Sequence, residues 1–185
     1  MEGAQAMSNL APLLDRNQAF ARTDARRDMP PLPFIPRLTL YIVTCIDYRV
    51  DPAEILGVRL GEALVERNIG GRITPAVIQD IAYASYLVQT KAPEGPYFEV
   101  AIIHHTDCGS TLLADDDLRH GFAQRVGIDE RALADTPVLD PARTVRTDVE
   151  RVLWADQIPP DVLVSGHVYD VRTGLVTTIV DAKKK

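Results

Sequence analysis

The sequence predicts an α/β fold with a mostly parallel central sheet flanked by helices and a hairpin at the C-terminal end. Short β-rich runs alternate with helical patterns, as they do in parallel sheets with helical crossovers. The run at 38–44 is largely apolar, which is typical of a buried strand in a parallel sheet. The runs at 162–171 and 175–180 flank the turn Thr173-Gly174, which predicts the hairpin.

The chain divides into a short N-terminal part and one main domain. Its 185 residues, 46% of them hydrophobic, are enough for one α/β domain to bury its own core. Before that domain, the amphipathic stretch Leu10–Ala21 predicts a helix. The proline-studded stretch Met29–Pro36 predicts an extended arm, because proline lacks an amide donor. We therefore expect a helix and arm in residues 1–36 and a single domain in 37–185.

The first half of the main domain contains three predicted elements after the strand at 38–44. Asp51-Pro52-Ala53-Glu54 has the cap, the first-turn proline and the glutamate of a helix start. Residues 63–66 predict a short strand, and the paired glycines of Arg67-Asn68-Ile69-Gly70-Gly71 follow it. A helix from Thr74-Pro75 to Thr90 has apolar residues at helical spacing, so one face packs on the sheet.

The second half begins with a third strand at 98–104. Helices are predicted at 115–126, closed by Gly127, and at 141–156, capped by Asp140. The hairpin follows. The last residues, Lys183–Lys185, are expected to be a frayed charged tail.

Charge and hydropathy exclude several classes of partner. The net charge of -6 and a pI near 5.2 argue against non-specific binding to nucleic acid or to an anionic membrane, which needs clustered positive charge. Residues 1–30 lack the basic and apolar segments of a signal peptide, and no apolar run reaches the roughly 20 residues of a membrane span. We expect a cytoplasmic protein that acts on a small molecule, without nucleic-acid or membrane partners.

The two cysteines and one histidine follow predicted strands. Cys45 ends the first strand, and His105 and Cys108 follow the third. Open α/β sheets place ligands at this carboxyl edge. Thiolate and imidazole bind zinc, and catalytic zinc sites take three protein ligands and leave a fourth position to water. The arrangement favours a catalytic zinc site with one Zn²⁺ per chain, and a structural disulfide between the two cysteines is the alternative.

The remaining histidines are weaker candidates. His104 is adjacent to the proposed ligand, but neighbouring strand residues point to opposite faces, and only His105 has the spacing to Cys108 that fits. His104 is therefore interpreted as a packing or hydrogen-bonding residue. His120 and His167 are interpreted as surface and hairpin residues.

Two motifs resemble those of the β-carbonic anhydrases: Cys45-Ile46-Asp47-Tyr48-Arg49 and His105-Thr106-Asp107-Cys108. The likeness extends to the segments 67–71 and 166–174 and covers roughly residues 38–180. It implies a zinc-binding catalytic domain in residues 37–185, a lyase that reversibly hydrates carbon dioxide to bicarbonate and a proton. It also implies that Cys45, His105 and Cys108 bind the zinc. By the same resemblance Asp47 and Arg49 form a catalytic dyad, and Gly70 and Gly71 contact the substrate.

Zinc chemistry suggests a role for Asp47 and Arg49. A carboxylate beside zinc either ligates the metal or accepts a hydrogen bond from water on it. If the fork of Arg49 holds Asp47, the carboxylate stays off zinc and its pKa falls. Zinc then lowers the pKa of its water from about 15.7 toward about 7 and supplies zinc-bound hydroxide as the nucleophile. A solvated turn pair is the plainer interpretation of these two residues.

Other functions stay open. Relatives of the β-carbonic anhydrases hydrolyse carbonyl sulfide or carbon disulfide on the same scaffold, and the motifs cannot separate these reactions. Tyr48, Ile69 and Asp107 depart from the common pattern, so the pocket can differ in size or substrate. A non-catalytic zinc-binding or redox module is a further alternative, and the paired glycines can be a turn and nothing more.

The N-terminal segment predicts self-association. Its amphipathic stretch and proline arm have too little local core of their own. In the resembling family such a segment embraces a neighbouring subunit. We therefore expect a homodimer or a higher homo-oligomer.

Overall fold

The computed structural model describes residues 9–23, 32–94 and 98–185. It divides into two units, Met1–Pro33 and Phe34–Lys185. The predicted N-terminal helix is present as α1 (Ala11–Arg22), none of whose side chains is buried. Residues 29–31 of the predicted arm lie outside the described residues. Among the described residues, no helix is both long and apolar enough to cross a bilayer.

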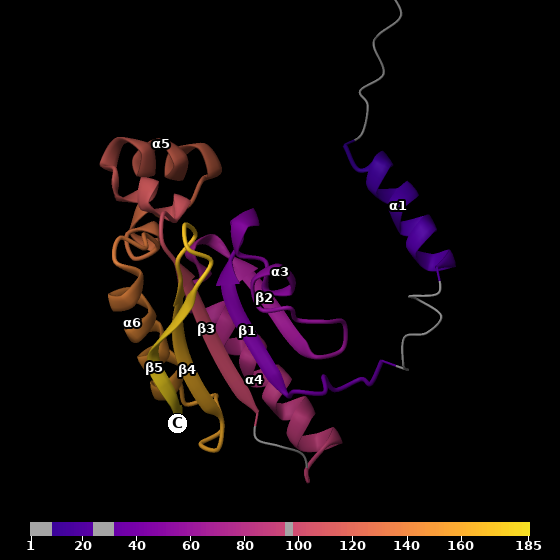
Figure 1. Ribbon diagram of the computed structural model, residues 1–185. Helices are drawn as coiled ribbons and strands as arrows, with labels where there is room; N and C mark the ends of the chain where they lie inside the picture. The colour runs from indigo at the N-terminus through magenta and orange to yellow at the C-terminus, as the bar shows by residue number, and fades with distance from the viewer. Residues whose placement is uncertain (1–8, 24–31, 95–97) are drawn as a thin grey trace, which may run out of the picture. The chain divides into compact units, whose positions relative to one another are not determined.

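The second unit is built on a five-stranded sheet of order β2-β1-β3-β4-β5 (Figure 1). The strands β1 to β4 are mutually parallel, and β5 is antiparallel to β4, as the sequence predicted. Their bounds are β1 (Leu40–Cys45), β2 (Ala63–Asn68), β3 (Glu99–His105), β4 (Leu163–Tyr169) and β5 (Val176–Lys184).

One prediction about the C-terminal end is wrong. The expected frayed tail is the end of β5, where Lys183 pairs with Val164 and Lys184 with Leu163. The amide of Lys185 also donates to the carbonyl of Val162 at 3.0 Å. Strand pairing needs only the backbone, and lysine side chains are well suited to an edge strand because they discourage pairing with another chain.

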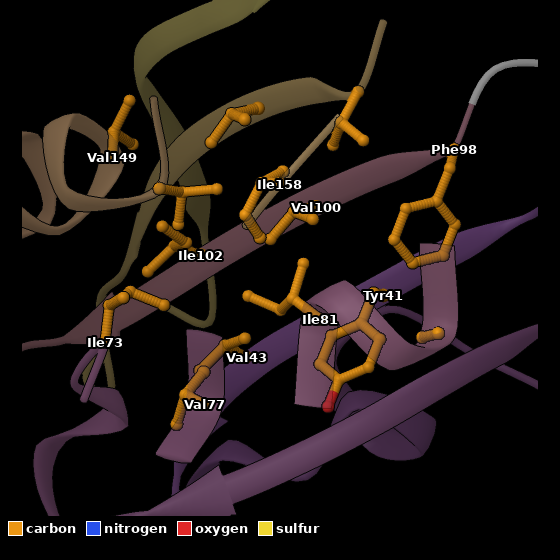
Figure 2. Packing of buried hydrophobic residues seen from close by; sticks show 14 of the residues in the cluster. Tyr41, Val43, Ile73, Val77, Ile81, Phe98, Val100, Ile102, Val149 and Ile158 are labelled. Carbon is orange, nitrogen blue, oxygen red and sulfur yellow. The ribbon is translucent and has the colours of Figure 1, made fainter. Parts of the chain in front are cut away.

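The main core lies between one face of the sheet and the two long helices α4 (Pro75–Lys91) and α6 (Pro141–Trp154). Figure 2 shows this packing, in which side chains of β1 and β3 meet those of both helices. Thr74 and Asp140 cap the two helices, as predicted, by accepting bonds from the amides of Val77 and Arg143. The fully buried residues of this main core are Val43, Ile81, Val100, Ile102, Val145, Val149, Val152 and Val164.

A smaller core on the other face contains two of the three proposed ligand residues, Cys45 and Cys108. Its buried members are Ile42, Cys45, Val50, Ile103, Cys108, Val138 and Tyr169. Short elements surround it: α3 (Pro52–Ile55), α5 (Asp116–Val126) and four 3₁₀ turns, η1 (Tyr48–Val50), η2 (Ile69–Gly71), η3 (Gly109–Ala114) and η4 (Glu130–Leu133). The helix predicted from Asp51 is only the single turn α3, and Gly57, at φ +67°, follows shortly after it.

Strand register brings the motif residues to one edge of the sheet. Thr44 of β1 pairs with Ile103 of β3, so the residues that follow both strands leave the sheet at the same level. Cys45 pairs with Asn68 of β2 on its other side. Three loops therefore meet beside the carboxyl ends of β1, β2 and β3, which is where the site lies.

Candidate metal centre

Cys45, His105 and Cys108 form one buried cluster, and their ligand atoms all lie within 4.8 Å of one another. Cys45 is the last residue of β1, His105 is the last residue of β3, and Cys108 immediately precedes η3. The structure thus brings together the three residues that the sequence singled out as ligands.

The two sulfur atoms lie 3.8 Å apart, and both cysteines are free, so the disulfide alternative is not what the structure contains. A hydrogen bond with Cys108 lowers the pKa of Cys45 to about 4, although burial opposes this change. The same bond, together with burial, raises the pKa of Cys108. The pair therefore holds one negative charge readily and resists a second one unless a cation shares the site.

The ring of His105 is oriented for ligation. Its Nδ1 lies 2.9 Å from the carbonyl oxygen of Thr106 and donates to it, because a carbonyl can only accept. This bond fixes the tautomer that leaves a lone pair on Nε2, and Nε2 is buried with no hydrogen-bond partner among the described residues. The buried lone pair of Nε2 and the two nearby sulfur atoms can therefore bind one metal ion together.

The donor set fits zinc. Tetrahedral zinc with Zn–S distances of about 2.3 Å requires a sulfur separation of about 3.8 Å. The observed 3.8 Å separation of the two Sγ atoms has this value. Two thiolates and one imidazole also match the ligand preferences of zinc, and they leave a fourth position open.

Asp47 lies beside the cluster and is held by Arg49 through three hydrogen bonds. The Arg49 amide and Nε donate to Oδ1, each at 2.9 Å, and Nη2 donates to Oδ2 at 2.7 Å. These bonds lower the pKa of Asp47 to about 2, with burial acting in the opposite direction. The carboxylate is thus ionised at neutral pH and turned toward arginine, as the sequence predicted for a clamped dyad.

Asp107 holds the other side of the Arg49 guanidinium, a role that sequence reasoning missed. Its Oδ2 accepts from Nη1 at 2.8 Å and its carbonyl accepts from Nη2 at 2.9 Å. Asp107 has φ +55°, a left-handed conformation that aspartate tolerates better than most residues. The guanidinium therefore uses four of its five N–H groups to join the two ligand-bearing loops.

Arg67, at the end of β2, supports the loop that carries Asp47. It donates to the carbonyl of Cys45 at 2.9 Å, to the carbonyl of Asp47 at 2.6 Å and to Oδ2 of Asp51 at 2.9 Å. Sequence reasoning assigned no role to Arg67. A usable signal was its position at the end of a strand parallel to β1, where its side chain reaches the adjacent loop.

His104 belongs to a buried polar network, which confirms its interpretation as a hydrogen-bonding residue. Its Nε2 lies 3.2 Å from Oδ2 of Asp148 on α6 and 3.2 Å from the carbonyl of Gly71. Arg72 donates to the same carboxylate at 2.7 and 3.2 Å, and Arg151 does so at 2.9 Å. Asp148 and His104 are completely buried. The network fixes α6 against the strand that carries the proposed ligand.

Asp148→Asn is expected to destabilise the fold by about 3–5 kcal/mol, because Arg72 would stay buried without its buried counter-charge and would keep only the exposed Asp135, 3.7 Å away. Burial raises the pKa of Asp148, but bonds from His104 and Arg72 outweigh it and the net pKa is lowered. A lowered carboxyl pKa gives stability that is present above about pH 4 and is lost as pH falls below it.

Urea unfolding at pH 7 and at acidic pH measures both effects. Glu150→Gln on the same helix is the control, because its exposed pair with Lys183 contributes less than about 1 kcal/mol. Equal losses for the two variants at pH 7 would contradict the role given to the network.

The paired glycines form the turn η2 between β2 and α4, and both have positive φ, +76° at Gly70 and +65° at Gly71. Asn68 closes this turn by accepting from the amide of Arg72 at 2.8 Å and donating to its carbonyl at 2.9 Å. Gly70 lines a cavity beside the cluster, whereas Gly71 is packed against the backbone at the end of β1. Contact of either glycine with substrate stays a prediction.

Gly71→Ala is expected to lower the free energy of unfolding by about 2–5 kcal/mol, combining left-handed strain with overpacking. An added Cβ would lie 2.8 Å from the carbonyl carbon of Thr44 and 3.0 Å from the amide of Cys45, and backbone cannot move aside cheaply. Gly127→Ala is the control, because Gly127 has φ +72° but open space around it. Chemical denaturation of both variants measures the difference, and equal losses would show that the close approach is unimportant.

The cavity beside the cluster has a volume of about 630 Å³. Cys45, Asp47 and Gly70 lie in its wall together with Gly109 and Ser110. The rest of the wall is mostly apolar and comes from the loop after β1 and from η2, η3 and α5: Ile46, Ile69, Leu112, Leu113, Leu118, Gly121, Phe122 and Arg125. The space next to the proposed metal position is thus suited to a small apolar molecule.

The other residues noted in the sequence are not part of the cluster. Tyr48 is 87% exposed, and His120 is exposed and contacts Glu130. His167 lies on β4 between Ser165 and Thr178, and burial lowers its pKa. Of the three departures from the common pattern, Ile69 alone lines the cavity, while Asp107 acts through Arg49.

Comparison with known proteins shows which family this chain belongs to. The family model described as carbonic anhydrase matches residues 40–134, which include all three cluster residues. The chain is also 32% identical to β-carbonic anhydrase 1 of Mycobacterium tuberculosis over 149 residues, 80% of this chain and 86% of that protein. It belongs to the β-carbonic anhydrase family. As a member of this family of zinc enzymes, it has the cysteine and histidine cluster that the metal requires.

Other β-carbonic anhydrase relatives support the fold and widen the chemistry. The crystal structure of carbonic anhydrase from Streptococcus mutans superposes with a TM-score of 0.78 at 30% identity, covering 95% of this chain and 99% of that one. A relative from Saccharolobus solfataricus, 29% identical over 158 residues (72% of this chain and 74% of that protein), is named a carbon disulfide hydrolase. Family membership therefore supports carbon dioxide hydration in general.

Proposed function

We propose that this protein reversibly hydrates carbon dioxide to bicarbonate and a proton, with one Zn²⁺ per chain held by Cys45, His105 and Cys108. The observation that carries the proposal is the buried three-ligand cluster next to a carboxylate clamped away from it. A structural zinc site takes four protein ligands, whereas a catalytic one keeps a position open. Zinc bound by this set would lower the pKa of water and supply hydroxide near neutral pH.

Asp47 acts in the proposal as a hydrogen-bond acceptor at a single atom. Its Oδ1 already accepts two hydrogen bonds from Arg49, which uses both lone pairs. From the described part of the chain, Oδ2 accepts only one, which leaves a lone pair for the proton of the attacking water or hydroxide. With a pKa of about 2, the carboxylate stays ionised and orients the nucleophile without releasing a proton itself.

The cavity wall supports the substrate assignment. Carbon dioxide is small, linear and apolar, and the side chains of Ile46, Ile69 and Leu112 lie on the wall that also contains Cys45 and Asp47. Apolar walls admit the gas without competing for hydrogen bonds. Gly70 lies in the same wall, in keeping with its proposed contact with substrate.

Stopped-flow hydration of carbon dioxide by the zinc-loaded protein tests the proposal directly. We expect proton release well above the uncatalysed rate, and its loss when a chelator removes the metal. A zinc-loaded protein that shows no hydration between about pH 6 and 9, the range around the water pKa of about 7, would contradict the proposed reaction.

Hydrolysis of carbon disulfide or carbonyl sulfide is the second candidate. The mostly apolar lining of the cavity is compatible with it, because both molecules are small and apolar. The relative from Saccharolobus solfataricus that is named a carbon disulfide hydrolase also supports this second candidate. Parallel assays of carbon dioxide hydration and sulfide release decide which substrate has the higher kcat/KM.

A non-catalytic zinc or redox module is a weaker alternative. It has no need of an arginine that withdraws a possible ligand from the metal, as Arg49 withdraws Asp47. Metal analysis together with thiol titration separates zinc binding from redox chemistry, since zinc binding masks both cysteines. Free thiols in this centre are consistent with a reducing compartment, and the proposed location is the cytoplasm.

Self-association is the last part of the proposal. The helix α1 buries none of its side chains, and Leu13, Leu14 and Phe20 are exposed on it. An amphipathic helix without a core needs a partner surface, and we propose that a second copy of the chain supplies it. Light scattering at micromolar concentration is expected to give at least a dimer. A monomeric mass with full activity would contradict this.

A further inference from the structure

Ser110 contacts a ligand sulfur and is not among the residues of the proposed reaction. It lies two residues after Cys108, in η3, and only 5% of its surface is exposed. Its Oγ lies 3.1 Å from the Sγ of Cys108 and 3.1 Å from the backbone nitrogen of Val138. A buried hydroxyl thus bridges one proposed metal ligand and a distant segment of the main chain.

The direction of these two bonds follows from the chemistry of the groups. A backbone amide only donates, so the N–H of Val138 occupies a lone pair of the Ser110 oxygen. A metal-bound cysteine is a thiolate and has no proton to donate. The hydroxyl proton of Ser110 is therefore directed at the Sγ of Cys108, where the charge of the acceptor strengthens the bond.

Packing holds the hydroxyl in this position. A Cβ added to Gly70 would lie 3.2 Å from Ser110 Oγ and 3.1 Å from Cγ2 of Val138, so the glycine turn closes over both residues. Three separate segments, η2, η3 and the chain at Val138, meet around one oxygen atom. The amide of Val138 thus anchors the oxygen beside the sulfur.

We propose that Ser110 is a positioning residue whose hydroxyl donates a hydrogen bond to the Cys108 thiolate and tunes its electron donation to the bound metal. This inference rests on the proposed zinc centre. Hydrogen bonds to ligands commonly set ligand orientation and metal affinity. Withdrawing charge from one sulfur makes the metal a stronger Lewis acid, which favours ionisation of water near neutral pH.

Cobalt(II) substitution makes the hydrogen bond visible without relying on turnover. The probe is the near-ultraviolet charge-transfer band from thiolate sulfur to cobalt, whose energy rises when the sulfur accepts a hydrogen bond. Ser110→Ala is expected to shift this band to longer wavelength and to weaken zinc binding about 10–100-fold in a chelator competition. Ser110→Thr keeps a hydroxyl and is expected to restore the position of the band.

Thr111→Val is the matched control. Thr111 lies on the same 3₁₀ turn, and its hydroxyl donates to the carbonyl of Cys108 at 2.8 Å and not to the sulfur. Its removal is expected to leave the charge-transfer band unchanged, so loss of a nearby hydroxyl by itself is tested separately from loss of the sulfur contact.

The outcomes separate this inference from the proposed function. Cobalt binding and hydration by the unsubstituted protein, with the band displaced in Ser110→Ala only, support the inference. An unchanged band and zinc affinity in Ser110→Ala, or an equal shift in Thr111→Val, would overturn it and leave the proposed function intact. A failure of the unsubstituted protein to bind cobalt or zinc would overturn both. Ser110→Thr keeps the inference testable even where Ser110→Ala folds poorly, because a retained hydroxyl with a displaced band contradicts it.

Discussion

Cys45→Ser and Cys108→Ser proteins are expected to lose their zinc and, with it, essentially all hydration of carbon dioxide. Each change removes one of two thiolates from a three-ligand set, and the described chain offers no fourth group within that cluster to replace it. A serine hydroxyl does not ionise at neutral pH and is a poor zinc ligand. The buried Nε2 of His105 would then remain without a partner.

Elemental analysis of dialysed protein measures this effect, with circular dichroism to verify the fold. His120→Gln is the control, since His120 is exposed, contacts Glu130 and is not part of the cluster. It is expected to keep near-stoichiometric zinc. Full zinc in either cysteine variant would refute the ligand assignment.

Arg49→Ala and Asp47→Ala are expected to reduce turnover severely and for different reasons. Without the guanidinium, Asp47 loses the two hydrogen bonds from Nε and Nη2 and keeps the one from the backbone amide, so the carboxylate is free to turn and close on the metal as a fourth ligand. Zinc stays bound, but the position for the nucleophile is filled. Without the carboxylate, the position stays open, but the nucleophile loses its acceptor at Oδ2. Each loss is expected to be about 10–100-fold, with Arg49→Ala at the upper end.

The pH dependence separates these causes. The pKa of Asp47 is about 2, so the carboxylate keeps its charge throughout the neutral range and does not shape the profile. Activity of the wild type is expected to rise from acid to alkaline pH, because protonation removes the hydroxide nucleophile near a pKa of about 7. In Arg49→Ala, a competing carboxylate ligand is expected to displace this rise toward higher pH.

Initial rates of hydration between about pH 6 and 9, around the water pKa of about 7, together with zinc content, measure both variants. Arg67→Lys is a comparison on the same loop, because Arg67 holds backbone carbonyls of Cys45 and Asp47 but does not touch the carboxylate. Wild-type turnover with an unchanged pH profile in Arg49→Ala would show that Arg49 is not needed to keep Asp47 away from the metal.

Much of the fold and the candidate ligand set could be predicted from the sequence because both depend on local patterns. Strand runs, helix caps and the terminal turn are short-range signals, and they predicted the strand directions of the sheet. The carboxyl ends of parallel strands share one edge, so Cys45 and His105 were expected to meet although they are far apart in the chain. The end of β5 was missed, because lysine composition indicates a tail while backbone pairing does not depend on it.

Tertiary structure alone decided what holds and tunes the candidate site. Asp107 and Arg67 act on the Asp47 loop across gaps of 58 and 20 residues, and Asp148 on α6 contacts His104 on β3. Ser110 depends on Val138, 28 residues away, for the direction of its proton. Hydrogen bonds are directional and short, so they form only where the packed chain places donor and acceptor within about 3 Å. Residue type and spacing can name a ligand, but its supporting partners are set by the three-dimensional positions of unrelated segments.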